Sequence, residues 1–170
     1  EAIQTERDAH GPFTSLSDFL CRVAERSFNR KSLEALIKCG ALDAFGERAH
    51  LLVHIEALLA FHRDATAPAA QDSLFGTVAA PTIAIPETGE STSLTDKLLW
   101  EHELLGIYVS GHPLDAHSAV TGKAGTSIGA ILAEPAPGLP VIIPILIVEV
   151  RPVLTKSGEK MAFLKLEDRT

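Results

Sequence analysis

Residues 29–40 read NRKSLEALIKCG and carry the signals of a complete short helix. Asn29 is a residue type that caps helix N-termini, and Gly40 is a type that ends helices. Between these two positions the apolar residues recur at helical spacing and share one face: Leu33, Leu36 and Ile37. The pattern predicts a helix that buries one apolar side in a core.

Two neighbouring stretches show the same kind of pattern. Residues 15–25, SLSDFLCRVAE, place Ser15 or Ser17 as a candidate N-cap before an apolar stripe. Residues 47–64, ERAHLLVHIEALLAFHRD, predict a third helix with these buried positions: Leu51, Leu52, Ile55, Leu58 and Leu59. Short helices joined by tight turns form a compact all-α unit, which we expect over residues 1–63.

The pattern then changes. Residues 64–95 are rich in Ala, Pro, Gly and Thr and are typical of a linker. Residues 96–118 predict an amphipathic helix ending near Gly106, followed by a turn, and we expect both to pack on the helical unit. The residues expected to dock this helix are Leu98, Trp100 and Leu104. Residues 119–139 contain several Gly and Pro residues and predict a loose connection.

Residues 140–170 have the period of strands. VIIPILIVEVRPVL is β-branched, MAFLKLED alternates apolar and polar residues, and Gly158 lies in the turn between them. One face of the second strand would carry Ala162, Leu164 and Leu166. Pro144 removes a backbone donor, so we expect the first strand to be bulged or at an edge there. The chain as a whole is predicted to be α+β.

Known catalytic and metal-binding patterns fail on this sequence. HELLG, residues 102–106, begins like a zinc-binding helix but has Gly where the second His is required. TGKAG, residues 121–125, lacks the first Gly and the final Ser or Thr of a phosphate-binding loop. His112, Asp115 and His117 lie in a Pro-containing turn, where local hydrogen bonds are more common than a metal ion. We expect no catalytic residue, metal ligand or cofactor in this chain.

Charge gives a mixed signal about partners. The net charge of −7 argues against general nucleic-acid binding by bulk attraction. Residues 22–38 nevertheless contain a concentration of basic residues: Arg22, Arg26, Arg30, Lys31 and Lys38. This segment is either a local basic patch or an ordinary solvated helix face.

The sequence favours a cytoplasmic protein without a membrane partner. No uninterrupted apolar stretch of about 18 residues is present. Cys21 and Cys39 have no metal or redox spacing, so we expect reduced thiols. The chain begins within a helical pattern and ends on LEDRT without a stop signal, and we therefore expect a fragment.

One stretch of the linker is not explained by its composition. AQDSLFG, residues 70–76, places Leu74 and Phe75 side by side between polar residues. Two adjacent large apolar side chains in such a segment need a partner. They either dock in a pocket outside the linker or pin the linker onto the helical unit.

Three stretches together resemble one protein family. Residues 11–46 (GPFTSLSDFLCRV to NRKSLEALIKCGALDAFG), 103–115 (ELLGIYVSGHPLD) and 155–168 (TKSGEKMAFLKLED) resemble, in this order, the C-terminal half of the α subunit of bacterial DNA polymerase III. The resemblance covers nearly the whole chain, and LLGIYVSGHPLD is a specific signature of the family. It implies a helix-hairpin-helix unit followed by the first antiparallel strands of an OB-fold.

The resemblance also implies what the chain does. The parent would be a DNA-directed DNA polymerase, a nucleotidyltransferase that uses Mg²⁺ in DNA replication. Its metal-binding carboxylates would lie before residue 1, which agrees with the missing catalytic motifs. The chain itself would serve processivity, by gripping duplex DNA and tethering the polymerase to the β sliding clamp. Other replisome subunits would contact the parent chain elsewhere.

The implied clamp site falls on the unexplained stretch. The family's clamp-binding peptide has Gln, two variable positions, Leu or Met, and then Phe, which Gln71, Leu74 and Phe75 match. An extended segment can insert both apolar side chains into a preformed pocket while the Gln contacts polar groups at its rim.

The implied DNA site lies at the start of the helix quoted first. In the family a hairpin presents a helix N-terminus to the phosphates of duplex DNA. The resemblance carries this contact onto Arg26, Asn29, Arg30 and Lys31. A complete OB-fold would also bind single-stranded template, for which this chain supplies only the first two strands.

Two alternatives remain open. The error-prone paralogue of the same subunit would resemble this chain over the same stretches, but the intact Gln71-Leu74-Phe75 peptide favours the replicative form. A protein-interaction module without DNA binding is favoured by the net charge.

Overall fold

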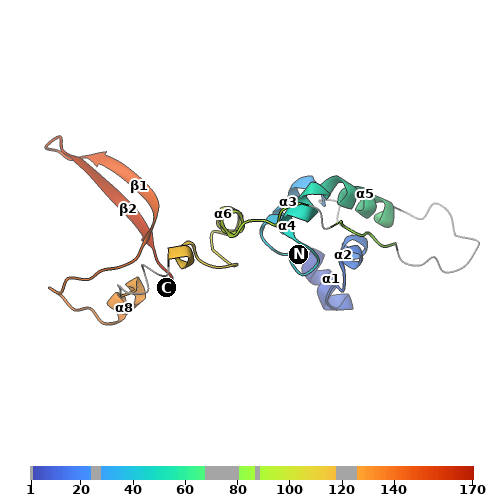
Figure 1. The fold of residues 1–170 in the computed structure, drawn as a ribbon, viewed down its shortest axis with the longest axis horizontal. Helices are drawn as coiled ribbons and strands as arrows, with labels where there is room; N and C mark the ends of the chain where they lie inside the picture. The colour runs from blue at the N-terminus through green and yellow to red at the C-terminus, as the bar shows by residue number, and fades with distance from the viewer. Residues whose placement is uncertain (1, 24–27, 68–80, 87–88, 118–125) are drawn as a thin grey trace, which may run out of the picture. The chain divides into compact units, whose positions relative to one another are not determined.

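The computed structural model describes residues 2–23, 28–67, 81–86, 89–117 and 126–170 (Figure 1). The chain divides into two units, Glu1–Ile107 and Tyr108–Thr170. The first unit contains α1 (Ala2–His10), α2 (Leu16–Arg22), α3 (Arg30–Lys38), α4 (Arg48–Val53), α5 (Ile55–Thr66) and α6 (Leu94–Leu105). The second contains a 3₁₀ turn, η1 (Pro113–His117), α8 (Ile128–Ala133), β1 (Leu146–Leu154) and β2 (Lys160–Glu167). The predicted α+β class is confirmed.

Side-chain caps set where the helices of the first unit begin. Ser15, rather than Ser17, caps α2, because its Oγ accepts a hydrogen bond (3.1 Å) from the backbone N–H three residues on. Asn29 caps α3 as predicted, in a reciprocal capping box with Ser32. Gly40 ends the same helix in the left-handed conformation, at φ +83°.

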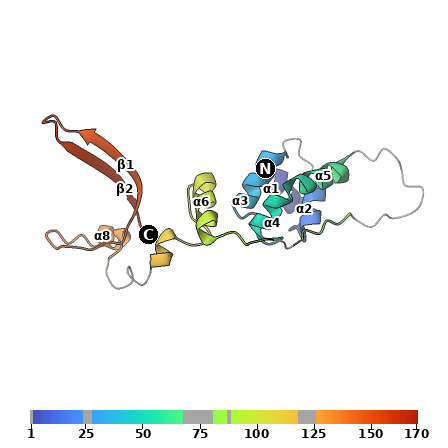
Figure 2. The same cartoon turned by 45° about the horizontal axis from the view of Figure 1, so that its top comes forward.

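The core of the first unit is built from α2 to α5 and the turn after α3, which Figure 2 shows gathered together. Its buried apolar side chains are Leu16, Phe19, Leu20, Val23, Leu33, Ile37, Leu42, Leu51, Ile55 and Leu58. Leu52 and Leu59, which we expected in this core, are only partly buried against it.

The helix expected over residues 47–64 is two helices. The chain departs from helical geometry at His54, where φ is −98° and ψ is 14°. The ring Nδ1 of His54 lies 2.9 Å from the carbonyl oxygen of His50, which also accepts the His54 backbone N–H (3.2 Å). A side chain that competes for a helical carbonyl favours a bend at that position, which periodicity alone does not reveal.

A buried ion-pair network joins α6 to the other helices. Arg48 of α4 is 1% exposed, and its guanidinium donates to both carboxylate oxygens of Asp43 (2.8 Å each). It also donates to the carbonyl oxygen of Lys38 (2.9 Å) and to Oε1 of Glu101 on α6 (2.8 Å). The hydrogen bonds that Arg48 donates to Asp43 and Glu101 raise the pKa of its guanidinium above the usual range, although burial opposes them.

Apolar contacts supplement this network along α6. Leu98 is buried as expected, and Trp100 is half-buried with the Lys38 ammonium 5.6 Å from its ring centre. Leu104 is 43% exposed and contributes less to docking than its spacing suggested. The position of α6 therefore depends on a charged pair as much as on its apolar stripe.

The second unit is a hairpin held to a short helix and a turn. β1 and β2 pair antiparallel from Leu146–Glu167 to Leu154–Lys160. The bulge lies between Ile147 and Glu149, whereas Pro144, where we expected one, precedes the strand. Both strands expose large apolar side chains, for example Phe163 (61% exposed).

Polar contacts close the base of this unit. The carboxylate of Asp168, just after β2, accepts the Ile128 N–H at the start of α8. Arg169 forms an ion pair with Asp115 of η1 (2.9 Å) and donates to the carbonyl oxygen of Leu114. Helix α8 lies within residues 119–139, where we predicted only a loose connection. Its Ser127 cap was the available sequence signal.

Replacing Glu101 with Gln should destabilise the first unit by about 3 kcal/mol, because the change leaves the buried Arg48 charge with one carboxylate fewer. Urea denaturation of the chain measures this loss. Glu103→Gln removes an equal charge from an exposed position of the same helix and should change the free energy of unfolding by less than about 0.5 kcal/mol. Equal stability of the two variants would contradict the assigned role of the pair.

Candidate functional site

The first turn of α3 presents the described part of the predicted DNA contact. Asn29 Oδ1 accepts the Ser32 N–H (3.1 Å), and the Asn29 N–H donates to Ser32 Oγ (2.8 Å). The amide side chain of Asn29 therefore serves the helix start itself. Arg30 and Lys31 are exposed beside it, while Arg26 lies outside the described residues.

The two exposed cations of this turn have different surroundings. Arg30 is 61% exposed and forms an ion pair with Glu56, which is 69% exposed in the first turn of α5. Lys31 forms no ion pair with any residue that the structure describes. Lys31 is therefore available to an anionic partner, whereas Arg30 already has one carboxylate beside it.

Arg22 belongs to the interior contacts of the unit and not to an open basic patch. Its guanidinium donates to Oε1 of Glu6 (3.1 Å), Oδ2 of Asp18 (3.1 Å) and the carbonyl oxygen of Gly11 (2.9 Å). It also lies 4.5 Å from the ring centre of Phe13. These contacts hold α1 and the following turn against α2.

Lys38 is similarly engaged, through an ion pair with Glu34 (2.6 Å) and its position over the ring of Trp100. Because Arg22 and Lys38 are engaged in internal contacts, segment 22–38 exposes fewer available cations than its sequence suggests. In the described residues it reduces to Arg30 and Lys31.

The segment predicted to be a linker is anchored at two places. The Ile83 N–H donates to Oγ of buried Ser17 (2.9 Å), and the side chains of Ile83 and Ile85 pack against the core. Further on, the Thr92 N–H donates to Oε1 of Glu47 (2.9 Å). Sequence reasoning missed these anchors, although the alternation in PTIAIP, residues 81–86, was a usable signal.

The predicted clamp-binding residues Gln71, Leu74 and Phe75 lie outside the described residues, within residues 68–80. This interval is bounded by the end of α5 at Thr66 and by the anchor at Ile83. Apolar pinning of the segment onto the helical unit is seen at Ile83 and Ile85.

Glu47 combines a helix cap with one of these anchors. Its carboxylate accepts the Ala49 N–H (2.6 Å) at the start of α4 and both the N–H and the hydroxyl of Thr92. Burial raises the pKa of Glu47, but the hydrogen bonds from Thr92 and Ala49 outweigh it, so the pKa lies below its usual value.

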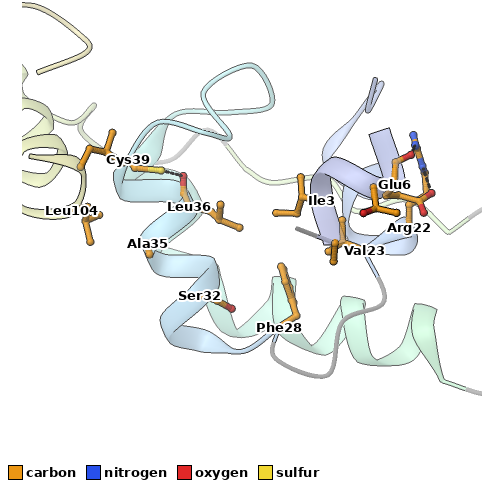
Figure 3. A pocket seen from close by; sticks show the side chains of 13 residues that line it. Ile3, Glu6, Arg22, Val23, Phe28, Ser32, Ala35, Leu36, Cys39 and Leu104 are labelled. Atoms are coloured by element: carbon orange, nitrogen blue, oxygen red, sulfur yellow. Dashed lines mark hydrogen bonds and ion pairs between the residues drawn. The ribbon is translucent and has the colours of Figure 1, made fainter. Parts of the chain in front are cut away.

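A pocket of about 920 Å³ opens beside α1, α3 and α6 (Figure 3). Figure 3 shows Ile3 and Leu36 pointing toward one another across it, with Phe28 at one side. Its charged lining residues, Glu6 and Arg22, bond to one another. Two other polar lining groups donate to backbone carbonyl oxygens: Cys39 Sγ to that of Leu36 (3.4 Å) and Ser32 Oγ to that of Asn29 (2.9 Å). The lining therefore offers mainly apolar contact.

The described ranges contain no group of three or more His, Cys, Asp or Glu side chains arranged to hold a metal ion. In the same ranges no helix is long and apolar enough to cross a membrane.

Comparisons with known proteins show which proteins this chain resembles. A family model described as "Helix-hairpin-helix motif" matches residues 1–51. Over 99% of this chain, the sequence is 39% identical to DNA polymerase III subunit alpha of Thermus aquaticus. Over 94% of this chain, it is 40% identical to the subunit of Bacillus subtilis (strain 168). The Pseudomonas aeruginosa subunit is 31% identical over the whole chain. The chain spans only 14–16% of the length of these relatives.

The Glu47 anchor predicts a pH dependence. A carboxylate with a lowered pKa in the folded state stabilises above its unfolded pKa, and this stability is lost as pH falls through the folded pKa. The Thr92 amide resonance in an NMR titration should therefore move with a midpoint below 4.5, the usual value for Glu. Glu47→Gln should abolish the movement. A midpoint at or above 4.5 would contradict the anchor.

Proposed function

The chain is homologous to one segment of bacterial DNA polymerase III α subunits, and from this premise we propose that it binds duplex DNA and tethers the polymerase to the β sliding clamp. The observation that carries the proposal is the match of nearly the whole chain to these subunits, with a helix-hairpin-helix model over residues 1–51. The polymerase reaction itself belongs to the whole subunit and is not assigned to these residues.

The DNA contact is proposed for the first turn of α3. Arg30 and Lys31 are exposed there, and Lys31 has no carboxylate partner within the described residues. The cationic surface is small, and each phosphate contact adds only a limited, salt-dependent term. We therefore expect weak binding to duplex DNA that does not depend strongly on sequence.

The clamp contact is proposed for Gln71, Leu74 and Phe75. Ile83 and Ile85 already pin the following segment to the core, so Leu74 and Phe75 are not required for that task. Burying a Leu and a Phe side chain could contribute roughly 3–6 kcal/mol before ordering costs. Ordering subtracts several of those, which favours an exchangeable contact.

The second unit is proposed to supply the first strands of an OB-fold. Apolar side chains such as those of Val150 and Phe163 are exposed along the hairpin, which is consistent with cover by further strands. Two strands alone are marginal as a sheet. Binding of single-stranded template would require the complete fold.

The DNA proposal is tested by Arg30→Gln with Lys31→Gln. This pair should weaken binding to a primed duplex at low salt and reduce the slope of log affinity against log salt by about 2, one for each lost phosphate contact. Fluorescence anisotropy measures both quantities. Lys160→Gln with Lys165→Gln changes the net charge equally but lies on β2. If only this control pair weakened binding, the interface would lie on the hairpin; absence of binding by the unaltered chain would favour an interaction module.

The clamp proposal is tested by Leu74→Ala with Phe75→Ala. Calorimetry with purified β clamp should give micromolar-range binding for the unaltered chain and at least about 100-fold weaker binding for the variant. The control, Ile83→Ala with Ile85→Ala, removes similar apolar surface from the neighbouring anchor and should leave clamp binding within a few-fold. Unchanged binding by the first variant would place the clamp contact elsewhere.

A further inference from the structure

The ion pair between Arg30 and Glu56 bears directly on the proposed DNA contact, and the inference drawn from it rests on that function. Arg30 is the first residue of α3, and Glu56 lies in the first turn of α5. The pair joins two helix N-termini on the outside of the unit. It places a carboxylate beside one of the two cations proposed to meet phosphate.

The position of Glu56 in the first turn of α5 is electrostatically favourable in itself. A carboxylate in the first turn of a helix interacts favourably with the positive end of the helix dipole. Both side chains of the pair are largely exposed, 61% for Arg30 and 69% for Glu56. Exposed pairs of this kind contribute little to stability, so the pair can open without unfolding the unit.

A phosphate that binds Arg30 must compete with this carboxylate. A carboxylate at ion-pair distance from the guanidinium also lies close to any phosphate on the same group, and the like charges repel. Lys31 has no such neighbour among the described residues. The two adjacent cations should therefore differ in how strongly an acidic residue opposes their contact with DNA.

We infer that Glu56 sets the strength of DNA binding at this surface: its carboxylate competes with phosphate for Arg30 and so lowers the affinity for duplex DNA. In the absence of DNA, Glu56 keeps Arg30 in an ion pair. The affinity for DNA is therefore lower than two unpaired cations would produce. A weaker DNA contact would suit a polymerase, because the enzyme must release and rebind phosphates as it moves along its template.

The test is the affinity of Glu56→Gln for a primed duplex, measured by anisotropy over a range of salt concentrations. The variant keeps the shape of the side chain and removes its charge. At low salt it should bind about five-fold more tightly than the unaltered chain, and the difference should disappear at high salt as the charges are screened. Glu103→Gln, which changes the net charge equally on α6, should have a smaller effect.

A double variant shows whether Glu56 acts through Arg30. In an Arg30→Gln background, Glu56→Gln should have no larger effect than Glu103→Gln. If the unaltered chain binds and Arg30→Gln weakens it, but Glu56→Gln behaves like the Glu103 control, the inference fails while the proposed function stands. If no variant binds DNA at low salt, both fail.

Discussion

The first unit depends on the burial of one guanidinium. Removing a charged group from water costs several kcal/mol unless carboxylates and hydrogen bonds replace the solvent. Arg48 meets this condition with Asp43, the Lys38 carbonyl and Glu101, and so joins the end of α3, the following turn, α4 and α6. Gly40 is required beside it, because a Cβ there would collide with the guanidinium.

Local features of the fold were predictable because their causes are local. The Asn29 cap, the Gly40 stop and the Gly106 stop follow from neighbouring residues, and each is found. The Arg48–Glu101 pair was not predictable, since 53 positions separate its members and neither belongs to a motif. The anchor between Ile83 and Ser17 spans 66 positions and was missed for the same reason. For the site, the sequence placed Arg30 and Lys31 at a helix start. It could not show that Arg22 pairs with α1, α2 and the turn between them, or that Glu56 forms an ion pair with Arg30.

These contacts bear on how such a segment could serve a polymerase. A basic stretch that looks continuous in sequence becomes a small surface once its cations are assigned to their partners, within a chain of net charge −7. Under the proposed function, the small surface would give weak DNA binding, and the short peptide would give a weak clamp contact. Two weak contacts on one chain can nevertheless act together, because binding at one site raises the effective concentration at the other.

The joint action of the two contacts is the central claim, and it is tested by the affinity of the chain for β clamp loaded on primed DNA, beside its affinities for free clamp and for free DNA. If one chain holds both partners, the loaded clamp should be bound at least about ten-fold more tightly than either partner alone. Affinity for the loaded clamp no greater than for free clamp would contradict the account.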